Sequence, residues 1–162
     1  KAKEGGESSL VSFATVYNII LKEYPEYLAY YYHPAHYNHL GGDEPSLSPI
    51  FSYWKGKLAC RYLRQYIEVG HERKNIPLSR VQIDALNIFE EISHRDNLRI
   101  DMMLEPGDIQ LCNNYIVMHS RTSFLDYDEK DKQRKLVRLW LKMPNARKLA
   151  PDFPGRNGFS QE

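Results

Sequence analysis

Three groups of residues in this sequence have side chains suited to binding a metal ion or an anion. The first is a set of histidines at three-residue intervals, His33, His36 and His39, within the segment 27–49. Pro34 and the glycines that follow exclude a continuous helix, so no rigid frame holds the three imidazoles as metal ligands. The alternative interpretation is a solvated loop that borders a substrate pocket.

The second group is the triplet His94-Arg95-Asp96, which ends an amphipathic segment. A His-x-Asp triplet supplies two adjacent ligands in many non-haem Fe(II) sites. A histidine in the last turn of a helix, followed by an aspartate, is also ordinary helix-terminus chemistry, because the helix dipole favours the imidazolium. We expect the helix-terminus role here.

The third group lies nearer the C-terminus and pairs a histidine with arginines. His119 closes the apolar run YIVMH, and Arg134 and Arg138 belong to the run RKLVRLWLK. If both runs are strands, alternation places the two arginines on one face with Trp140, and His119 can face the same interior. A guanidinium in such a place needs an anionic partner, and a bound carboxylate suits its planar fork.

Two plainer interpretations of this group remain open at this point. The arginines can form internal salt bridges along an exposed strand edge, and a lone histidine at a strand end is more often structural than a metal ligand. Spacing alone does not decide between these interpretations and a site in which an imidazole and a carboxylate-binding arginine face each other.

The elements that must position these residues can be predicted from hydrophobic periodicity. We expect a helix capped by Ser8 or Ser9 and stopped by Pro25, with Leu10, Ala14, Tyr17 and Leu21 on one face, and a second helix from Ser79 to residue 94. We expect an irregular segment at 27–49, a hairpin at 50–62 turning at Lys55-Gly56, and strands at 99–104, 108–113, 115–119 and 134–142. Consecutive strands without intervening helices favour an antiparallel sandwich or barrel with helices packed outside it, followed by an extended tail at 145–162.

Composition limits the class of protein. The chain has 162 residues, 42% of them hydrophobic, which is enough for one domain with a real core. Lys and Arg number 22 against 21 Asp and Glu, so general attraction to nucleic acid or to anionic membranes is not expected. Cys60 and Cys112 do not have the spacing of a zinc finger and suit the reducing interior of a cell, so we expect a cytoplasmic protein. No run is long enough to span a membrane.

Three stretches, taken in order, resemble the TauD/TfdA family of Fe(II)- and 2-oxoglutarate-dependent dioxygenases. They are GGES at 5–8, PGDIQLCNNYIVMHSRTSF at 106–124 and RKLVRLWLK at 134–142. The resemblance implies a double-stranded β-helix (jelly roll) of the clavaminate synthase-like type, mainly β with flanking helices. It also implies that Fe(II), 2-oxoglutarate, O₂ and a small organic substrate are bound, and that succinate and CO₂ accompany the most common outcome, hydroxylation.

The resemblance also assigns roles to single residues. His119 would be the distal iron ligand, and Arg134 would bind the far carboxylate of 2-oxoglutarate. Ser8, which stands where the family usually has Thr, would donate its hydroxyl to that carboxylate. Arg138 holds a position that meets an anionic substrate in some members. The segment 27–48 is a candidate lid or substrate wall.

One departure from the family pattern shapes the remaining expectations. The family's His-x-Asp iron motif precedes the GGES turn, and this sequence contains only four residues before it. We therefore expect residues 1–162 to be the C-terminal part of a single dioxygenase domain. This part would be an incomplete jelly roll that is inactive alone and is completed by upstream polypeptide. A homo-oligomer is compatible with this interpretation. The alternative is a non-catalytic jelly-roll binding or scaffold module that has lost its metal. A His-x-Asp within about 40 residues upstream favours the enzyme.

Overall fold

The computed structural model describes residues 1–38, 44–141 and 143–153. Along the chain its elements are β1 (Glu4–Gly5), β2 (Ser8–Ser12), α1 (Phe13–Glu23), the 3-10 helix η1 (Pro25–Tyr27), α2 (Leu28–Tyr32), β3 (Ala35–Tyr37), β4 (Ser46–Ser48), β5 (Phe51–Trp54), β6 (Lys57–Cys60), α3 (Arg64–Arg73), α4 (Arg80–Ser93), β7 (Arg99–Met102), β8 (Val117–Arg121) and β9 (Phe124–Leu125). No helix in these ranges is long and apolar enough to cross a membrane.

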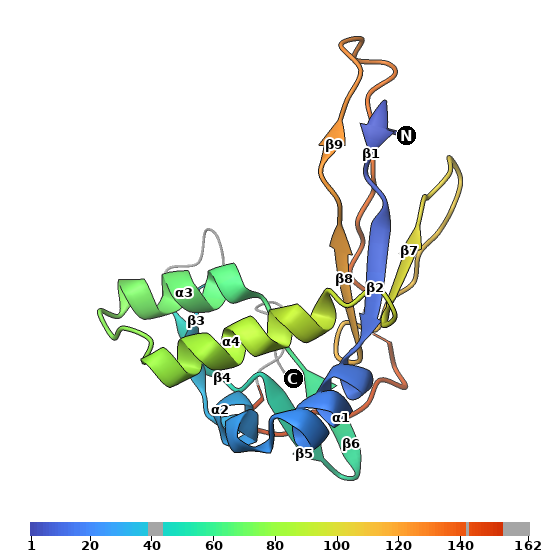
Figure 1. Cartoon of the computed structure of the whole chain (residues 1–162). Helices are drawn as coiled ribbons and strands as arrows, with labels where there is room; N and C mark the ends of the chain where they lie inside the picture. The colour runs from blue at the N-terminus through green and yellow to red at the C-terminus, as the bar shows by residue number, and fades with distance from the viewer. Residues whose placement is uncertain (39–43, 142, 154–162) are drawn as a thin grey trace.

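The elements form a helical body and a projecting arm of strands (Figure 1). The body contains the helices with the hairpins β3–β4 and β5–β6, and the arm contains β1, β2, β7, β8 and β9. In the arm, β2 lies between β7 and β8 and is antiparallel to both, while β1 pairs with β9. The predicted mixture of sheet and helices is confirmed, whereas the described strands do not close into a barrel.

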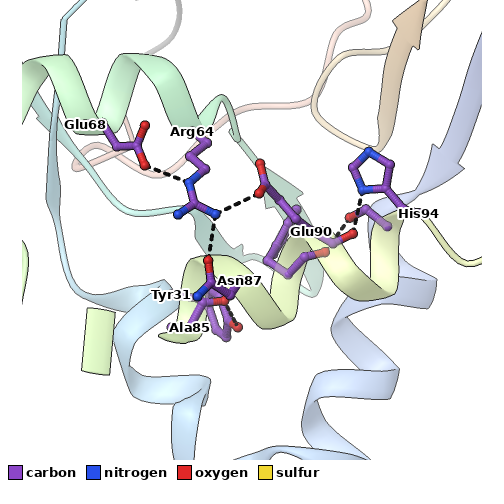
Figure 2. Close-up of polar contacts among 9 residues, drawn as sticks. Tyr31, Arg64, Glu68, Ala85, Asn87, Glu90 and His94 are labelled. Atoms are coloured by element: carbon purple, nitrogen blue, oxygen red, sulfur yellow. Dashed lines mark hydrogen bonds and ion pairs between the residues drawn. The ribbon is translucent and has the colours of Figure 1, made fainter. Parts of the chain in front are cut away.

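Aromatic packing holds the body together. Phe51 and Phe89 are fully buried, with ring centroids 5.8 Å apart, and Tyr31 packs against both rings at 5.6 and 5.9 Å. The Tyr31 hydroxyl donates a hydrogen bond to the carbonyl of Ala85 at 2.7 Å, which satisfies the only polar atom that this side chain brings into the core (Figure 2). This cluster joins α2, β5 and α4 in one core.

One arginine joins two helices of the body, α3 and α4. Arg64 on α3 donates from Nε to Glu68 at 2.7 Å, and from Nη1 to Asn87 at 2.8 Å and Glu90 at 2.7 Å on α4 (Figure 2). The fork of the guanidinium thus reaches both helices at once. The result is a fixed α3–α4 pair to which the arm is attached through the C-terminal end of α4.

Two predicted elements are confirmed. The hairpin at 50–62 is present as β5 and β6, and Lys55 and Gly56 at its turn both have positive φ, at 49° and 75°, as a two-residue turn of this kind requires. The helix from Ser79 is present as α4. Ser79 and Gln82 form a capping box, and Ala85, Phe89 and Ile92, which lie on one face of the helix, are buried.

The prediction for the first helix is wrong at its start. Ser8 and Ser9 lie in β2, and α1 is capped by Ser12, whose hydroxyl accepts a hydrogen bond from the Thr15 backbone. The buried side chains of α1 are accordingly Phe13, Val16 and Ile20, while Leu21 is exposed. The reason is that β7 and β8 pair with β2 from both sides, and those backbone hydrogen bonds compete with a helix in this segment.

Three other expectations need correction. The segment 27–49 is more regular than predicted, because it contains α2, β3 and β4. The sequence analysis missed α3, whose apolar residues are too sparse for a clear amphipathic pattern. Residues 108–113 and 134–141 are not strands in the described structure, and residue 142 lies outside it. Both segments have the alternation of strands but no neighbouring strand to pair with.

A glycine sets the distance between α3 and β3. A Cβ added at Gly70 would lie 2.3 Å from the carbonyl oxygen of His36, which is backbone and cannot rotate away. We expect Gly70→Ala to destabilise the chain by about 1–2 kcal/mol, because overpacking outweighs the better helix propensity of alanine. Urea unfolding measures this change, with Glu72→Ala on the exposed side of the same helix as the control. A stability equal to that of the control variant would contradict this packing.

Candidate functional site

The register of the arm brings Ser8 and His119 to the same face of one sheet. In the β2–β8 ladder Ser8 lies opposite Arg121, and Leu10 lies opposite His119. Residues directly opposite each other, and residues two apart on one strand, project to the same side. Ser8, Leu10, His119 and Arg121 therefore share one face, while Val11 on the other face is buried in the core of the body.

The GGES segment contains the short link between β1 and β2 (the Gly6 turn), and its backbone conformation favours glycine. Gly5 and Gly6 have φ of 67° and 86°, and a Cβ on Gly5 would lie 2.3 Å from the carbonyl oxygen of Ser123. Thr122 fixes the turn from the other side. Its hydroxyl accepts the backbone N–H groups of Gly6 and Glu7 at 3.0 and 3.1 Å, and donates to the Glu7 carboxylate at 2.6 Å. That last hydrogen bond holds the pKa of Glu7 below its usual value.

Arg134 lies against this turn although it is far away in sequence. Its Nε is 3.4 Å from the point that a Cβ on Gly6 would occupy, so a Cβ there would be in van der Waals contact with the guanidinium. The guanidinium carbon lies 5.4 Å from the centroid of the Phe124 ring. The backbone N–H of Arg134 donates to the Asp126 carboxylate at 2.8 Å. These contacts anchor Arg134 beside the strand that begins at Ser8.

His119 is exposed on β8, and its pKa is lowered below the ordinary value. The first cause is desolvation by neighbouring protein atoms, and the second is the positive charge of Arg138. Both disfavour the imidazolium, so the ring stays neutral to a more acidic pH than a free histidine. A neutral imidazole is the form that binds a metal ion. The same effect shows that Arg138, an exposed residue, lies close enough to act on His119.

Removing the charge of Arg138 tests this proximity. We expect Arg138→Gln to raise the pKa of His119, because a nearby cation no longer opposes protonation. The pKa stays below the usual value of about 6.5 because desolvation, the larger cause, remains. An NMR titration of the imidazole resonances in metal-free protein measures both values. Lys135→Gln is the control, and a pKa of His119 that is unchanged or lower in Arg138→Gln would contradict the account.

The histidines of segment 27–49 do not gather around one point. His33 caps the end of α2 and is exposed, and His36 lies half-buried in β3, where its backbone N–H donates to Nε2 of His71 at 3.2 Å. His39 lies outside the described residues. The pair His36 and His71 joins β3 to α3 through ring packing, with centroids 5.1 Å apart.

The His94-Arg95-Asp96 triplet has the helix-terminus role. Nδ1 of His94 donates to the carbonyl of Glu90 at 2.7 Å at the end of α4 (Figure 2), and Asp96 pairs with Arg99 at 3.1 Å. Across 1–38, 44–141 and 143–153 no group of three or more His, Cys, Asp or Glu side chains is placed to hold a metal ion. Neither alternative histidine group is therefore a metal site within the described chain.

The expected bound groups fit these residues unequally. A carboxylate fits, because the Gly6 turn leaves a space beside Arg134 that a Cβ would fill, and Ser8 supplies a hydroxyl on the adjoining strand. A complete Fe(II) site does not fit the described residues, since His119 is a single ligand and a facial site takes three from the protein.

Sequence reasoning missed Arg121, Thr122 and Phe124. It ended the strand at His119, whereas β8 continues to Arg121, because pairing with β2 extends as far as Ser8. The alternation of VMHSR already places His119 and Arg121 on one side, so Arg121 was accessible to the same period-2 argument. The roles of Thr122 and Phe124 depend on contacts with the distant GGES turn and were not accessible in this way.

Comparison with known proteins adds three findings. The sequence profile of the family described as Taurine catabolism dioxygenase TauD, TfdA family matches residues 1–140. FR-33289 synthase of Streptomyces rubellomurinus (strain ATCC 31215) is 36% identical over 157 residues, covering 92% of this chain and 46% of that protein. Taurine hydroxylase-like protein SAT17 of Stachybotrys chartarum (strain CBS 109288 / IBT 7711) is 29% identical over 140 residues, covering 83% of this chain and 36% of that protein. The chain thus spans less than half the length of either relative.

Proposed function

Because the chain belongs to the TauD, TfdA family, whose members in general depend on Fe(II) and 2-oxoglutarate, we propose that it forms part of an oxygenase of this type. One observation carries the proposal: the Gly6 turn places Arg134 beside the strand pair that presents Ser8 and His119 on one face. The reaction is the oxidation, most commonly the hydroxylation, of a small organic substrate by O₂, with succinate and CO₂ as co-products. The hydroxylase-like relative supports the reaction type.

Each of these residues has a defined task in the proposal. His119 supplies one neutral imidazole to the metal, and its lowered pKa keeps the ring unprotonated in mildly acidic solution. Arg134 and Ser8 bind the far carboxylate of 2-oxoglutarate and so fix its orientation. Arg138, whose charge acts on His119, is the candidate contact for an anionic group of the substrate. Bound Fe(II) would supply the activation of O₂, which side chains alone do not provide.

The arm presents apolar side chains that the described chain does not cover. Ile109 and Leu111, which flank Gln110, are 84% and 80% exposed, and Val137 and Leu139, which flank Arg138, are 85% and 76% exposed. Exposed apolar runs beside open sheet edges are typical of surfaces that pair with further strands. We propose that upstream strands of the same polypeptide pair here, complete a jelly roll and bring the two remaining metal ligands. A second copy of the chain is the alternative occupant, and sedimentation of the full-length protein as a dimer would favour it.

The competing function is a non-catalytic jelly-roll module that binds or positions another molecule. It accounts for the single metal ligand among the described residues without any upstream motif. Formation of succinate from 2-oxoglutarate by the full-length protein, with Fe(II) and O₂ supplied, separates the two functions. An oxygenase would form succinate in an Fe(II)-dependent manner, above the level of a metal-free control. The absence of succinate at every metal concentration favours the module.

The two cysteines bear on the location of the protein. The buried thiol of Cys60 and the free Cys112 fit a cytoplasmic location.

A further inference from the structure

Two arginines contact the same aromatic ring at the candidate site. The guanidinium carbon of Arg121 lies 4.2 Å from the centroid of Phe124, and that of Arg134 lies 5.4 Å from it. Two guanidinium groups that share one aromatic ring repel each other, and a bound anion would offset this repulsion. Within the described ranges neither side chain has an ion pair with a carboxylate.

Two carboxylates beside the Gly6 turn are already engaged with other donors. Glu7 accepts the hydroxyl of Thr122 at 2.6 Å. Asp126 accepts the backbone N–H groups of Arg134 at 2.8 Å and Tyr127 at 3.3 Å. These carboxylates fix the backbone around the turn, and neither forms an ion pair with the two guanidinium groups in the part of the chain that the structure describes.

Arg121 also adjoins the hydroxyl expected to bind the co-substrate. It lies directly opposite Ser8 in the β2–β8 ladder, so the two side chains project from neighbouring points on one face. Ser8 as a residue is 7% exposed. A serine hydroxyl beside a guanidinium that has no ion pair in the described ranges is suited to an incoming carboxylate.

We propose that Arg121 is a second binding residue for the far carboxylate of 2-oxoglutarate and shares it with Arg134 and Ser8. This assignment rests on the proposed function. The carboxylate has two oxygens with several lone pairs, which is enough to accept from both guanidinium groups and one hydroxyl. Contact with the Phe124 ring restricts both arginine side chains before binding, which reduces the conformational entropy that they lose when an anion binds.

The test compares two ligands that differ only in the far carboxylate. Dissociation constants for 2-oxoglutarate and 2-oxopentanoate are measured by calorimetry on the full-length, metal-loaded protein without O₂. Arg121→Ala is expected to weaken 2-oxoglutarate about tenfold and to leave 2-oxopentanoate nearly unchanged, because only the former offers the second carboxylate. Arg121→Lys, which keeps the charge without the fork, should lie between. The control is Arg80→Ala, an arginine with a largely exposed side chain that pairs with Asp84 on α4.

Each other outcome is informative. An equal loss of affinity for both ligands would give Arg121 a purely structural role and overturn the proposal, as would no loss for either. If the wild-type protein discriminates between the ligands and Arg134→Ala abolishes that discrimination while Arg121→Ala does not, Arg121 is excluded and the proposed function stands. If the wild-type protein does not prefer 2-oxoglutarate, the proposed function fails together with this inference.

Discussion

Replacing His119 with alanine is expected to weaken Fe(II) binding by the full-length protein by at least about 100-fold. Loss of a group that only orients a metal ligand already lowers metal affinity about 10- to 100-fold, and loss of the ligand itself lowers it more. The imidazole lies on the exposed face of β8, and its low pKa means that little proton release opposes metal binding near neutral pH. Anaerobic competition with a coloured chelator measures the affinity. Succinate formation should fall with it at limiting Fe(II).

His33→Ala is the matched control, because His33 is also exposed but lies at the end of α2 in the helical body. It should leave Fe(II) affinity unchanged. Comparable weakening in both variants would point to a general effect of losing a histidine, and unchanged affinity in His119→Ala would remove His119 from the metal site.

The second large effect is expected at Arg134. Arg134→Ala should weaken 2-oxoglutarate binding about 100-fold, because bidentate hydrogen bonds from a guanidinium to a carboxylate contribute about 2–3 kcal/mol to the binding free energy. The turn around Gly6 is built to admit this guanidinium, with its Nε 3.4 Å from where a Cβ would lie. Calorimetric titration of the metal-loaded protein with 2-oxoglutarate in the absence of O₂ measures the loss.

Arg134→Lys separates charge from geometry, because lysine keeps the cation but loses the planar fork, and it should recover only part of the affinity. Lys135→Ala is the control next to it in sequence, on an exposed residue. Equal affinity for 2-oxoglutarate in the wild-type protein and in Arg134→Ala would exclude Arg134 from the co-substrate site.

Local signals in the sequence predicted the elements that depend on local interactions. The capping box of α4 and the Lys55-Gly56 turn are encoded within a few residues, and both are present. Pairing decided the elements that could not be predicted. Ser8–Ser12 has apolar residues compatible with a helix, yet it forms the central strand because β7 and β8 supply partners from distant parts of the chain. For the same reason 134–141, which alternates like a strand, is not one in the described structure.

The candidate site follows the same division. Alternation along β8 was enough to predict that His119 faces a common side with neighbours two residues away. The contact between Arg134 and Gly6 joins residues far apart in sequence, and only the resemblance to a known family brought them together in advance. Arg121 received no role because the predicted strand ended at His119; where β8 ends depends on how far β2 extends, although alternation alone places Arg121 on the same side as His119.

The most direct test of the account is the position of the metal and the co-substrate in crystals of the full-length protein grown without O₂, with Fe(II) and 2-oxoglutarate bound. The account predicts an anomalous peak for iron bonded to the imidazole of His119, and the far carboxylate of 2-oxoglutarate on the guanidinium of Arg134 beside the Gly6 turn. Iron bound elsewhere, or Arg134 paired with a carboxylate of the protein in place of 2-oxoglutarate, would contradict it.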